Sequence, residues 1–305
     1  MTRILVTGAS GLLGLNFCLQ FATRHDIVGC INTHGLRGVP FQVVTADLSQ
    51  PGSGERLLLE TKPEWVLHCA ALANLEACEK DTSLAQRLNA ELPGELARTA
   101  ARLGIGFTHI STDAVFDGIR GNYTEADQPH PVNVYSRTKL EGEQAVAEAN
   151  PQAIIARVNF YGWSLSGKRS LAEYFFNNLS VGRDVNGFKD VYFCPLQVLD
   201  LGDILMQMQT QNLQGLYHVL SPEQLSKYDF GVRLACRFGL DENRVKPIMW
   251  REGGLTAVRS PNLTLRVDKL ANDLHQELPG IEDGLKRFFN QYQHGIRKAI
   301  QSLVE

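Results

Sequence analysis

The first 160 residues alternate short apolar runs with longer amphipathic segments, and this rhythm is the strongest constraint on the fold. Segments with helical patterning, such as residues 11–24 and 83–104, separate apolar runs that have the length of strands. Those runs are residues 3–7, 26–32, 41–46, 65–70, 106–111 and 153–158. Nearly continuous apolar strands separated by helices indicate a parallel sheet that is covered on both faces. We therefore expect an α/β fold with a doubly wound, Rossmann-type sheet.

A glycine-rich loop follows the first apolar run and opens the first helix. Its sequence, TGASGLLG, sets three glycines in a GxxGxxG pattern. Glycine lets the backbone turn tightly, approach a pyrophosphate at the helix N-terminus and pack the helix on the strand. The loop could be a simple tight turn, but the strand before it and the helix after it are what a dinucleotide site requires. The residues expected to bind the cofactor here are Gly8, Ser10, Gly11, Leu12, Leu13 and Gly14.

The end of the second strand bears on the choice between NADPH and NADH. Sites that prefer NAD usually carry an acidic residue about 20 residues beyond the glycine motif. Asn32 lies at that place in this chain, and Arg37 follows it. The missing carboxylate and the nearby guanidinium favour NADPH, with NADH as the alternative. Arg37 could equally be a solvated loop charge.

Two further strand ends offer contacts to the cofactor. Asp47 and Leu48 follow the third strand, where the edge of an adenine could bind. An aspartate at a strand end is equally often a helix N-cap. Ala70 and Ala71 follow the fourth strand and are small enough for the cofactor to lie against them, although they could also be plain packing residues.

Beyond residue 160 the regular alternation ends. A region rich in glycine and aromatic residues is followed by an apolar run at 215–220, a helix at about 226–238 and a C-terminal helix from about Ile281. We therefore expect a dinucleotide-binding domain at residues 1–160. A smaller, mixed substrate-binding domain follows at residues 161–305, and some of its segments are expected to return to the first domain.

A tyrosine and a lysine lie four residues apart at the start of a predicted helix. In the stretch NVYSRTK, the helix begins near Asn133 and ends at Asn150-Pro151. Helical spacing places Tyr135 and Lys139 on one face. A phenol, with a reference pKa of about 10, carries protons poorly at neutral pH unless a cation lies beside it. Taken alone, the pair is most simply a helix-surface contact.

Three motifs in this order resemble a known family. TGASGLLG, Ser111-Thr112-Asp113 after the fifth strand, and the YxxxK of Tyr135 and Lys139 resemble the extended short-chain dehydrogenase/reductases. More narrowly, HISTDAVFDG at 109–118 and PVNVYSRTKLEGE at 131–143 are similar to the dTDP-4-dehydrorhamnose reductase branch. GLYHVL and the later RSPNLTL are similar to the C-terminal half of that branch, so the resemblance covers nearly the whole chain.

The resemblance implies a catalytic triad of Thr112, Tyr135 and Lys139. Tyr135 would act as the general acid that gives a proton to the carbonyl oxygen while hydride reaches the carbonyl carbon. Lys139 would lower the pKa of the phenol by its charge and would hold the nicotinamide ribose. Thr112 would hydrogen-bond the same carbonyl oxygen.

The resemblance also implies where the substrate binds. It places substrate near Asn74, Thr112, Asp113 and Phe160, and it gives Asn89 a supporting role. Phe160 stands where some members have tryptophan, which leaves the sugar open. Asn16 stands where some members have a glutamate that joins a magnesium site between subunits, so no metal is expected and a homodimer remains open.

The later half offers candidates for the nucleotide part of the substrate. Basic side chains could contact its diphosphate, and a cluster of aromatic residues could form a wall beside its base. Aromatic residues at such spacing are more often part of a core. The candidates are Lys168, Arg169 and Arg183 for the diphosphate and Tyr174, Phe175 and Phe176 for the base.

Composition excludes several other classes of protein. With 30 basic and 33 acidic side chains, the net charge of −3 argues against a partner that is a nucleic acid or a membrane surface. The six cysteines include no CxxC, the eight histidines are widely spread, and neither set suggests a metal site. Short apolar runs predict no membrane span and no signal peptide, so we expect a cytoplasmic protein.

The leading hypothesis is an NADPH-dependent reductase of a nucleotide-linked 4-keto-6-deoxy sugar. A sugar-nucleotide 4,6-dehydratase would typically show the motif TDE, but Ala114 follows Asp113 here. A 4-epimerase remains open, because the same triad can oxidise and then reduce a carbinol. Outside enzymology, the alternative is a regulatory subunit like the beta subunit of methionine adenosyltransferase.

Overall fold

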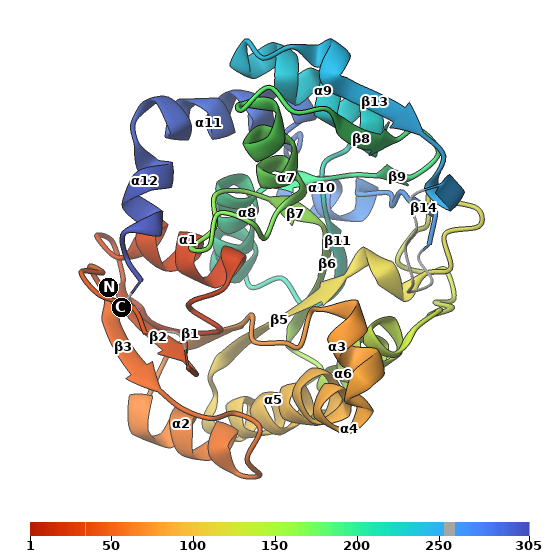
Figure 1. The fold of residues 1–305 in the computed structure, drawn as a ribbon. Helices are drawn as coiled ribbons and strands as arrows, with labels where there is room; N and C mark the ends of the chain where they lie inside the picture. The colour runs from red at the N-terminus through yellow and green to blue at the C-terminus, as the bar shows by residue number, and fades with distance from the viewer. Residues whose placement is uncertain (34, 253–259, 305) are drawn as a thin grey trace.

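A seven-stranded parallel sheet forms the centre of the molecule. The computed structural model describes residues 1–33, 35–252 and 260–304. The strand order is β11-β6-β5-β4-β1-β2-β3, and each of these neighbouring pairs is parallel (Figure 1). The strands are β1 (Arg3–Thr7), β2 (Asp26–Ile31), β3 (Gln42–Thr45), β4 (Trp65–His68), β5 (Gly106–Thr112), β6 (Ile154–Val158) and β11 (Gly215–Val219). The predicted doubly wound fold is confirmed.

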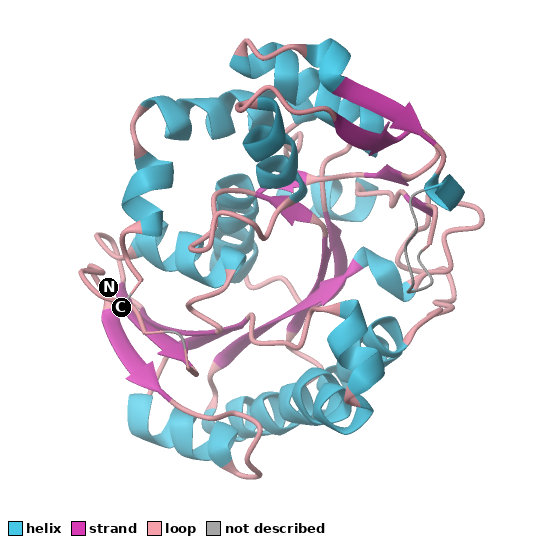
Figure 2. Cartoon of the chain, viewed as in Figure 1, coloured by secondary structure: helices cyan, strands magenta, loops and turns pink. Residues whose placement is uncertain are grey.

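Helices cover both faces of the sheet, as Figure 2 shows with cyan helices on either side of the magenta strands. The reason is visible in β1, where successive side chains point to opposite faces. Ile4 and Val6 pack with α1 and α8, whereas Leu5 packs with α2, α5 and α6. These helices are α1 (Leu12–Phe21), α2 (Ser53–Thr61), α5 (Leu92–Leu103), α6 (Val134–Ala149) and α8 (Val198–Thr210).

The strand order reverses beside β1, with β2 on one side and β4 on the other. In open α/β sheets, ligands bind in the crevice outside the carboxyl ends of the strands at such a switch point. The loops that leave β1 and β4 lie at this place: a Cβ added to Gly8 would lie 2.9 Å from the backbone nitrogen of Ala70. The topology therefore packs the glycine loop against Ala70 at the switch point.

One segment of the later half belongs to the main sheet. Residues 215–220 belong to the later half, from which some segments were expected to return to the first domain, and β11 pairs with β6 along its whole length. The chain returns through α8, which packs against α1 on the face that α1 already covers. The main sheet therefore contains strands from both sides of residue 160. The division into two domains at that residue stays a proposal.

The rest of the later half packs around an aromatic core. Trp163 stacks on Phe288 with ring centroids 3.9 Å apart, and Phe175 and Phe176 are buried in the same cluster. Of the two alternatives for Phe175 and Phe176, a wall beside a base or a place in the core, the structure has them in the core. Tyr174 is exposed on the same helix. The helices here are α7 (Leu171–Leu179), α9 (Lys227–Phe238), α10 (Asp268–Leu274), α11 (Ile281–Gln293) and α12 (Ile296–Gln301).

Small sheets complete this half. The pairs are β7 (Phe160–Tyr161) with β10 (Leu196–Gln197), β8 (Val185–Phe188) with β13 (Val245–Ile248), and β9 (Tyr192–Phe193) with both β12 (Leu225–Ser226) and β14 (Asn262–Leu263). Within the described ranges, no helix has the length and apolar character needed to cross a membrane.

Candidate active site

A cavity of 630 Å³ lies at the switch point of the sheet. It is bounded by the glycine loop and by the ends of β2, β3 and β4. The residues expected to bind cofactor that line it are Gly8, Ser10, Gly11, Leu12, Leu13, Gly14, Asn32, Asp47, Leu48, Ala70 and Ala71. The sequence prediction and the cavity thus agree at four successive strand ends.

The glycine loop is shaped as a cradle for a phosphate group. Gly8 has φ +68°, a conformation that favours glycine, and its Cα lies against the backbone after β4. Gly11 is the N-cap of α1 and offers no side-chain oxygen to the N–H groups of the first turn. Those N–H groups and the positive end of the helix dipole suit an anion. The loop therefore fits the pyrophosphate of a dinucleotide.

Gly14 allows the first turn of α1 to pack on the loop. A Cβ at this residue would lie 2.4 Å from the carbonyl oxygen of Gly8, which is a backbone atom that cannot move aside. We expect Gly14→Ala to lower the urea midpoint, with a loss of about 1–3 kcal/mol from overpacking. Gly106→Ala is the control, because its new methyl would meet only the movable amide of Gln209. Equal midpoints for the two variants would contradict this account of the loop.

Arg37 does not lie where a cofactor-binding residue was expected, and Asp47 does not take the alternative role of a helix N-cap. Among the described residues that line the cavity, Arg37 is absent; its backbone N–H donates to Leu303 O at 3.0 Å, near the C-terminus. Asp47 is not a helix N-cap, since Gly52 occupies that place before α2. Its carboxylate accepts from Ser49, which lowers the pKa of Asp47.

Some residues of this cavity were not anticipated from the sequence. Phe160, expected beside the substrate, lines the cavity together with Ile110 and Arg169. The other unanticipated lining residues are Cys30, Ile31, Ala46, Ser49, Cys69, Ala73, Leu84 and Leu88. Several of them adjoin the ends of β2, β3 and β4, so strand position was the available signal. Arg169 comes from the later half, and the sequence pattern carried no such signal for it.

Tyr135 and Lys139 are placed by the start of α6. Asn133 is the N-cap, and its side chain accepts from the backbone N–H of Ser136 at 2.8 Å. One turn beyond Tyr135, the Lys139 side chain is buried and donates from Nζ to Ile110 O at 2.7 Å. Burial lowers the pKa of Lys139 to about 8. The buried ammonium is therefore held at the end of β5, beside the cavity.

The pKa of Tyr135 differs from the expectation. The charge of Lys139 was expected to lower it, but burial raises the pKa of Tyr135 to about 12, partly opposed by a hydrogen bond with Thr112. Lys139 is directed to the carbonyl of Ile110 instead. In this state the phenol stays protonated at neutral pH, which is the form that a proton donor needs.

Thr112 and Asp113 connect Tyr135 to a second cavity, of 330 Å³, which Asp113 lines. Thr112 Oγ1 donates to Asp113 Oδ1 at 3.1 Å, and Asp113 Oδ2 accepts from Asn159 at 2.6 Å. The cavity is lined by Leu75, Asp113, Ala114, Asn133, Asn159, Phe188, Val191, Tyr192, Phe193, Lys227, Trp250, Ser260, Pro261 and Leu263. Its wall is mainly apolar and aromatic, with a few polar groups, as in sites that bind small molecules.

Asp113 should make stability depend on pH. Burial raises its pKa from 3.8 to about 6, so the native state holds this proton more strongly than the unfolded chain does. The stabilisation is complete below pH 4 and is lost as the pH rises towards 6. Between pH 4 and 7 we expect the wild type to lose on the order of 2–3 kcal/mol relative to Asp113→Asn in urea denaturation. Parallel curves for the two proteins would contradict this assignment.

The remaining predicted residues take supporting positions. Asn74 caps α3 (Leu75–Lys80) by accepting from Ala77 N at 2.7 Å. Asn89 lies in a π-helical turn, a feature frequent at functional sites, and is fully buried. Its Oδ1 accepts from the backbone N–H of Leu72 at 2.9 Å, and its Nδ2 donates to the backbone oxygen of Leu72 at 3.0 Å. Asn89 therefore fixes the segment between Ala71 and Asn74.

The three basic residues proposed for the substrate diphosphate and the residue Asn16 lie in different parts of the molecule. Lys168, Arg169 and Arg183 are all exposed, and of these three Arg169 lines the glycine-loop cavity. Asn16 is buried and donates to Leu12 O at 2.8 Å and Trp163 O at 2.9 Å. Across the described residues there is no group of three His, Cys, Asp or Glu side chains that could hold a metal ion.

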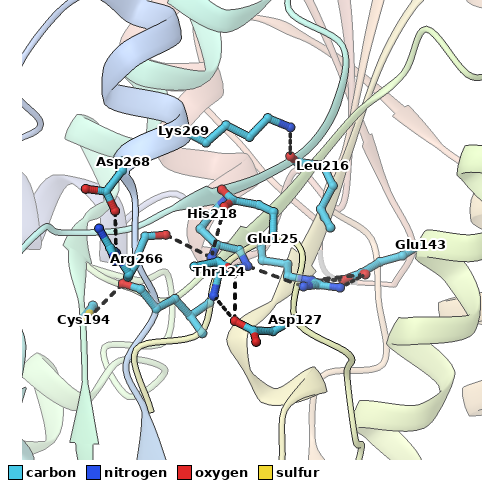
Figure 3. A network of polar contacts seen from close by, with 12 residues as sticks. Thr124, Glu125, Asp127, Glu143, Cys194, Leu216, His218, Arg266, Asp268 and Lys269 are labelled. Atoms are coloured by element: carbon cyan, nitrogen blue, oxygen red, sulfur yellow. Dashed lines mark hydrogen bonds and ion pairs between the residues drawn. The ribbon is translucent and has the colours of Figure 1, made fainter.

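Figure 3 shows a network of polar contacts that includes Glu143 and His218. Arg157 of β6 pairs with Glu143 of α6 through Nη2 and Oε2 at 2.7 Å, and both are almost fully buried. Ser111 also donates to Glu143. Glu143 lies one turn beyond Lys139, and its charge partly offsets the lowering of the Lys139 pKa by burial. The network thus ties α6 to the end of β5.

The sheet, the glycine loop at its switch point, and Tyr135 with Lys139 define an extended short-chain dehydrogenase/reductase. Residues 1–294 match the family described as RmlD substrate binding domain. The chain belongs to this RmlD family, which confirms the resemblance.

Known relatives differ in what they do. The chain is 30% identical to the probable low-salt glycan biosynthesis reductase Agl14 of Haloferax volcanii, covering 92% of this chain and 95% of that protein. It is also 30% identical to methionine adenosyltransferase 2 subunit beta of Bos taurus, covering 81% of this chain and 75% of that protein. Among solved structures, dTDP-4-dehydrorhamnose reductase from Bacillus anthracis, in complex with NADP, is similar with a TM-score of 0.82 and 25% identity, covering 95% of this chain and 99% of that one.

Proposed function

We propose that this protein is an NADPH-dependent reductase of a nucleotide-linked 4-keto-6-deoxy sugar, similar to dTDP-4-dehydrorhamnose reductase. One observation carries the proposal: hydrogen bonds connect Lys139 and Thr112, the neighbours of Tyr135, to residues that line the two cavities. Lys139 bonds to Ile110, which lines the glycine-loop cavity, while Thr112 bonds to Asp113, which lines the second cavity. In this proposal the phenol of Tyr135 acts on a carbonyl group held between the cofactor in one cavity and the rest of the substrate in the other.

The cofactor would be held by the glycine loop and by the ends of β2, β3 and β4. When bound, the reduced dinucleotide supplies hydride to the carbonyl carbon of the substrate. Tyr135 then donates its proton to the carbonyl oxygen, and Thr112 hydrogen-bonds that oxygen. Lys139, with a pKa of about 8, can hold positive charge beside the nicotinamide ribose.

NADPH is proposed over NADH for two reasons. Asn32 at the end of β2 presents no carboxylate that would repel a 2'-phosphate, and the Bacillus anthracis relative was solved with NADP. Arg37 does not support this preference, because it lies outside the cavity lining in the described part of the chain. NADH remains the second candidate.

The test is turnover with a panel of substrates. NADPH and NADH are offered with dTDP-, GDP-, CDP- and UDP-linked 4-keto sugars, and loss of nicotinamide absorbance is followed. Oxidation of NADPH by one class of 4-keto sugar is the expected result. Tightly bound NAD in the purified protein, with no consumption of added NADPH, would instead indicate an epimerase.

A second candidate function is a nucleotide-binding regulatory subunit. It is favoured by the methionine adenosyltransferase 2 beta subunits, whose identity to this chain equals that of the reductase Agl14. Co-purification with a partner of different size, together with no turnover on any keto sugar, would support this candidate. Retention of both Tyr135 and Lys139 favours catalysis.

A further inference from the structure

Arg169 brings a positive charge from the later half of the chain into the glycine-loop cavity. It is the only basic side chain among the described residues that line this cavity, and Asp47 is the only acidic one. Across the described ranges, the Arg169 guanidinium forms no ion pair within the protein. Among the described lining residues, Arg169 is therefore the one full positive charge that an anion in this cavity could meet.

The segment that carries Arg169, residues 162–170, contacts the first turns of α1. Asn16, on α1, is buried and donates to both Leu12 O and Trp163 O, so one amide joins the helix to the start of this segment. A Cβ at Gly162 would lie 3.5 Å from Leu12, and Ser170 Oγ donates to Gly162 O at 2.8 Å. Both ends of the segment therefore lie beside the N-terminal part of α1.

The backbone at Arg169 is also fixed. Its N–H donates to Glu173 Oε2 at 2.9 Å, and the same carboxylate accepts from Ser170 N at 3.1 Å and from Ser164 Oγ at 2.7 Å. Glu173 is fully buried and forms a capping box at the start of α7. The guanidinium thus extends from a rigid base towards the cavity, which lowers the entropy cost of holding a ligand.

We propose that Arg169 binds the pyrophosphate of the dinucleotide, so that the later half of the chain closes over the phosphates held at the N-terminus of α1. The glycine loop offers N–H groups there but no full positive charge, and a guanidinium fork matches phosphate oxygens. The anchoring at Leu12 and Asn16 favours the pyrophosphate over the 2'-phosphate, which would lie near Asn32. The diphosphate of the sugar nucleotide is disfavoured, because Arg169 lines the glycine-loop cavity and the second cavity has a different lining.

The inference rests on the proposed function and can be tested by binding alone. Dissociation constants for NADPH and NADH are measured by calorimetry with wild type, Arg169→Ala, Arg169→Lys and Lys168→Ala. Lys168 is the matched control, since it is the exposed neighbour of Arg169 and is absent from the lining of the cavity within the described chain. Thermal unfolding of each variant confirms that folding is intact.

We expect Arg169→Ala to weaken NADPH and NADH by the same factor, roughly 10- to 100-fold, because both carry the pyrophosphate. Arg169→Lys should lose less, and Lys168→Ala should bind like wild type. Unchanged affinity in Arg169→Ala would overturn the proposal, and weakening of NADPH alone would move the contact to the 2'-phosphate and overturn it too. If the wild type binds neither dinucleotide, the proposed function itself fails, and this inference fails with it.

Discussion

Tyr135→Phe is expected to abolish turnover while leaving the affinity for cofactor nearly unchanged. The substitution removes the hydroxyl that would donate the proton and keeps the ring that packs at the start of α6. Loss of a general acid typically costs 10²–10⁴-fold in rate. The measurement is kcat on the keto-sugar substrate found in the panel, together with the dissociation constant for NADPH.

Lys139 should behave differently from Tyr135. Lys139→Ala removes a buried ammonium that bonds to Ile110 O beside the cavity, so it should reduce kcat and weaken NADPH together. Arg137→Ala is the control on the same helix, because Arg137 is exposed and pairs only loosely with Glu141 at 3.9 Å. Near-normal turnover by Tyr135→Phe would remove Tyr135 from the proton-donor role.

Breaking the pair of Glu143 and Arg157 should have the largest effect on stability. Arg157 contacts the Glu143 carboxylate through Nε and Nη2 at 2.7–3.2 Å, and both residues are at most 5% exposed. Glu143→Leu would leave the guanidinium buried without its counter-charge, which typically costs about 3–5 kcal/mol. Urea denaturation of the variant measures this loss.

Two comparisons separate the charge effect from simple loss of packing. Glu143→Leu combined with Arg157→Met removes both charges and should recover much of the stability, since apolar replacements of buried pairs are often tolerated. Glu55→Ala breaks an exposed pair with Arg102 and should cost at most about 1 kcal/mol. A double variant no more stable than Glu143→Leu would contradict the unpaired-charge explanation.

The tautomer of His218 is consistent with this network. Burial, with the charge of Arg157 as the next cause, lowers the pKa of His218 to about 3, so the ring is neutral at physiological pH. Its Nδ1 lies 3.0 Å from Arg266 O and can donate, which leaves Nε2, 3.4 Å from Arg157 Nη1, to accept. Every polar atom of the ring then has a partner, which supports a neutral histidine below the guanidinium.

Local signals in the sequence determined much of the fold. The run of residues 3–7 became β1 because it is apolar and ends at a glycine that must adopt positive φ. The helix that begins after Asn133 and ends at Asn150 follows from a side-chain cap at one end and Pro151 beyond the other. These signals involve neighbours in the chain, so they could be recognised without a structure.

By itself, the sequence determined the alternation of strands and helices from which the doubly wound sheet was predicted, the glycine loop, and the placing of Tyr135 and Lys139 on one helical turn, because each of these patterns depends on residues close together in the chain. The tertiary structure decided what depends on distant contacts. It placed Arg169 in the cavity and Arg37 outside its described lining, put Phe175 and Phe176 in the core, and brought β11 into the main sheet. It also raised the pKa of Tyr135, because burial is a property of the folded chain and not of the residues beside it.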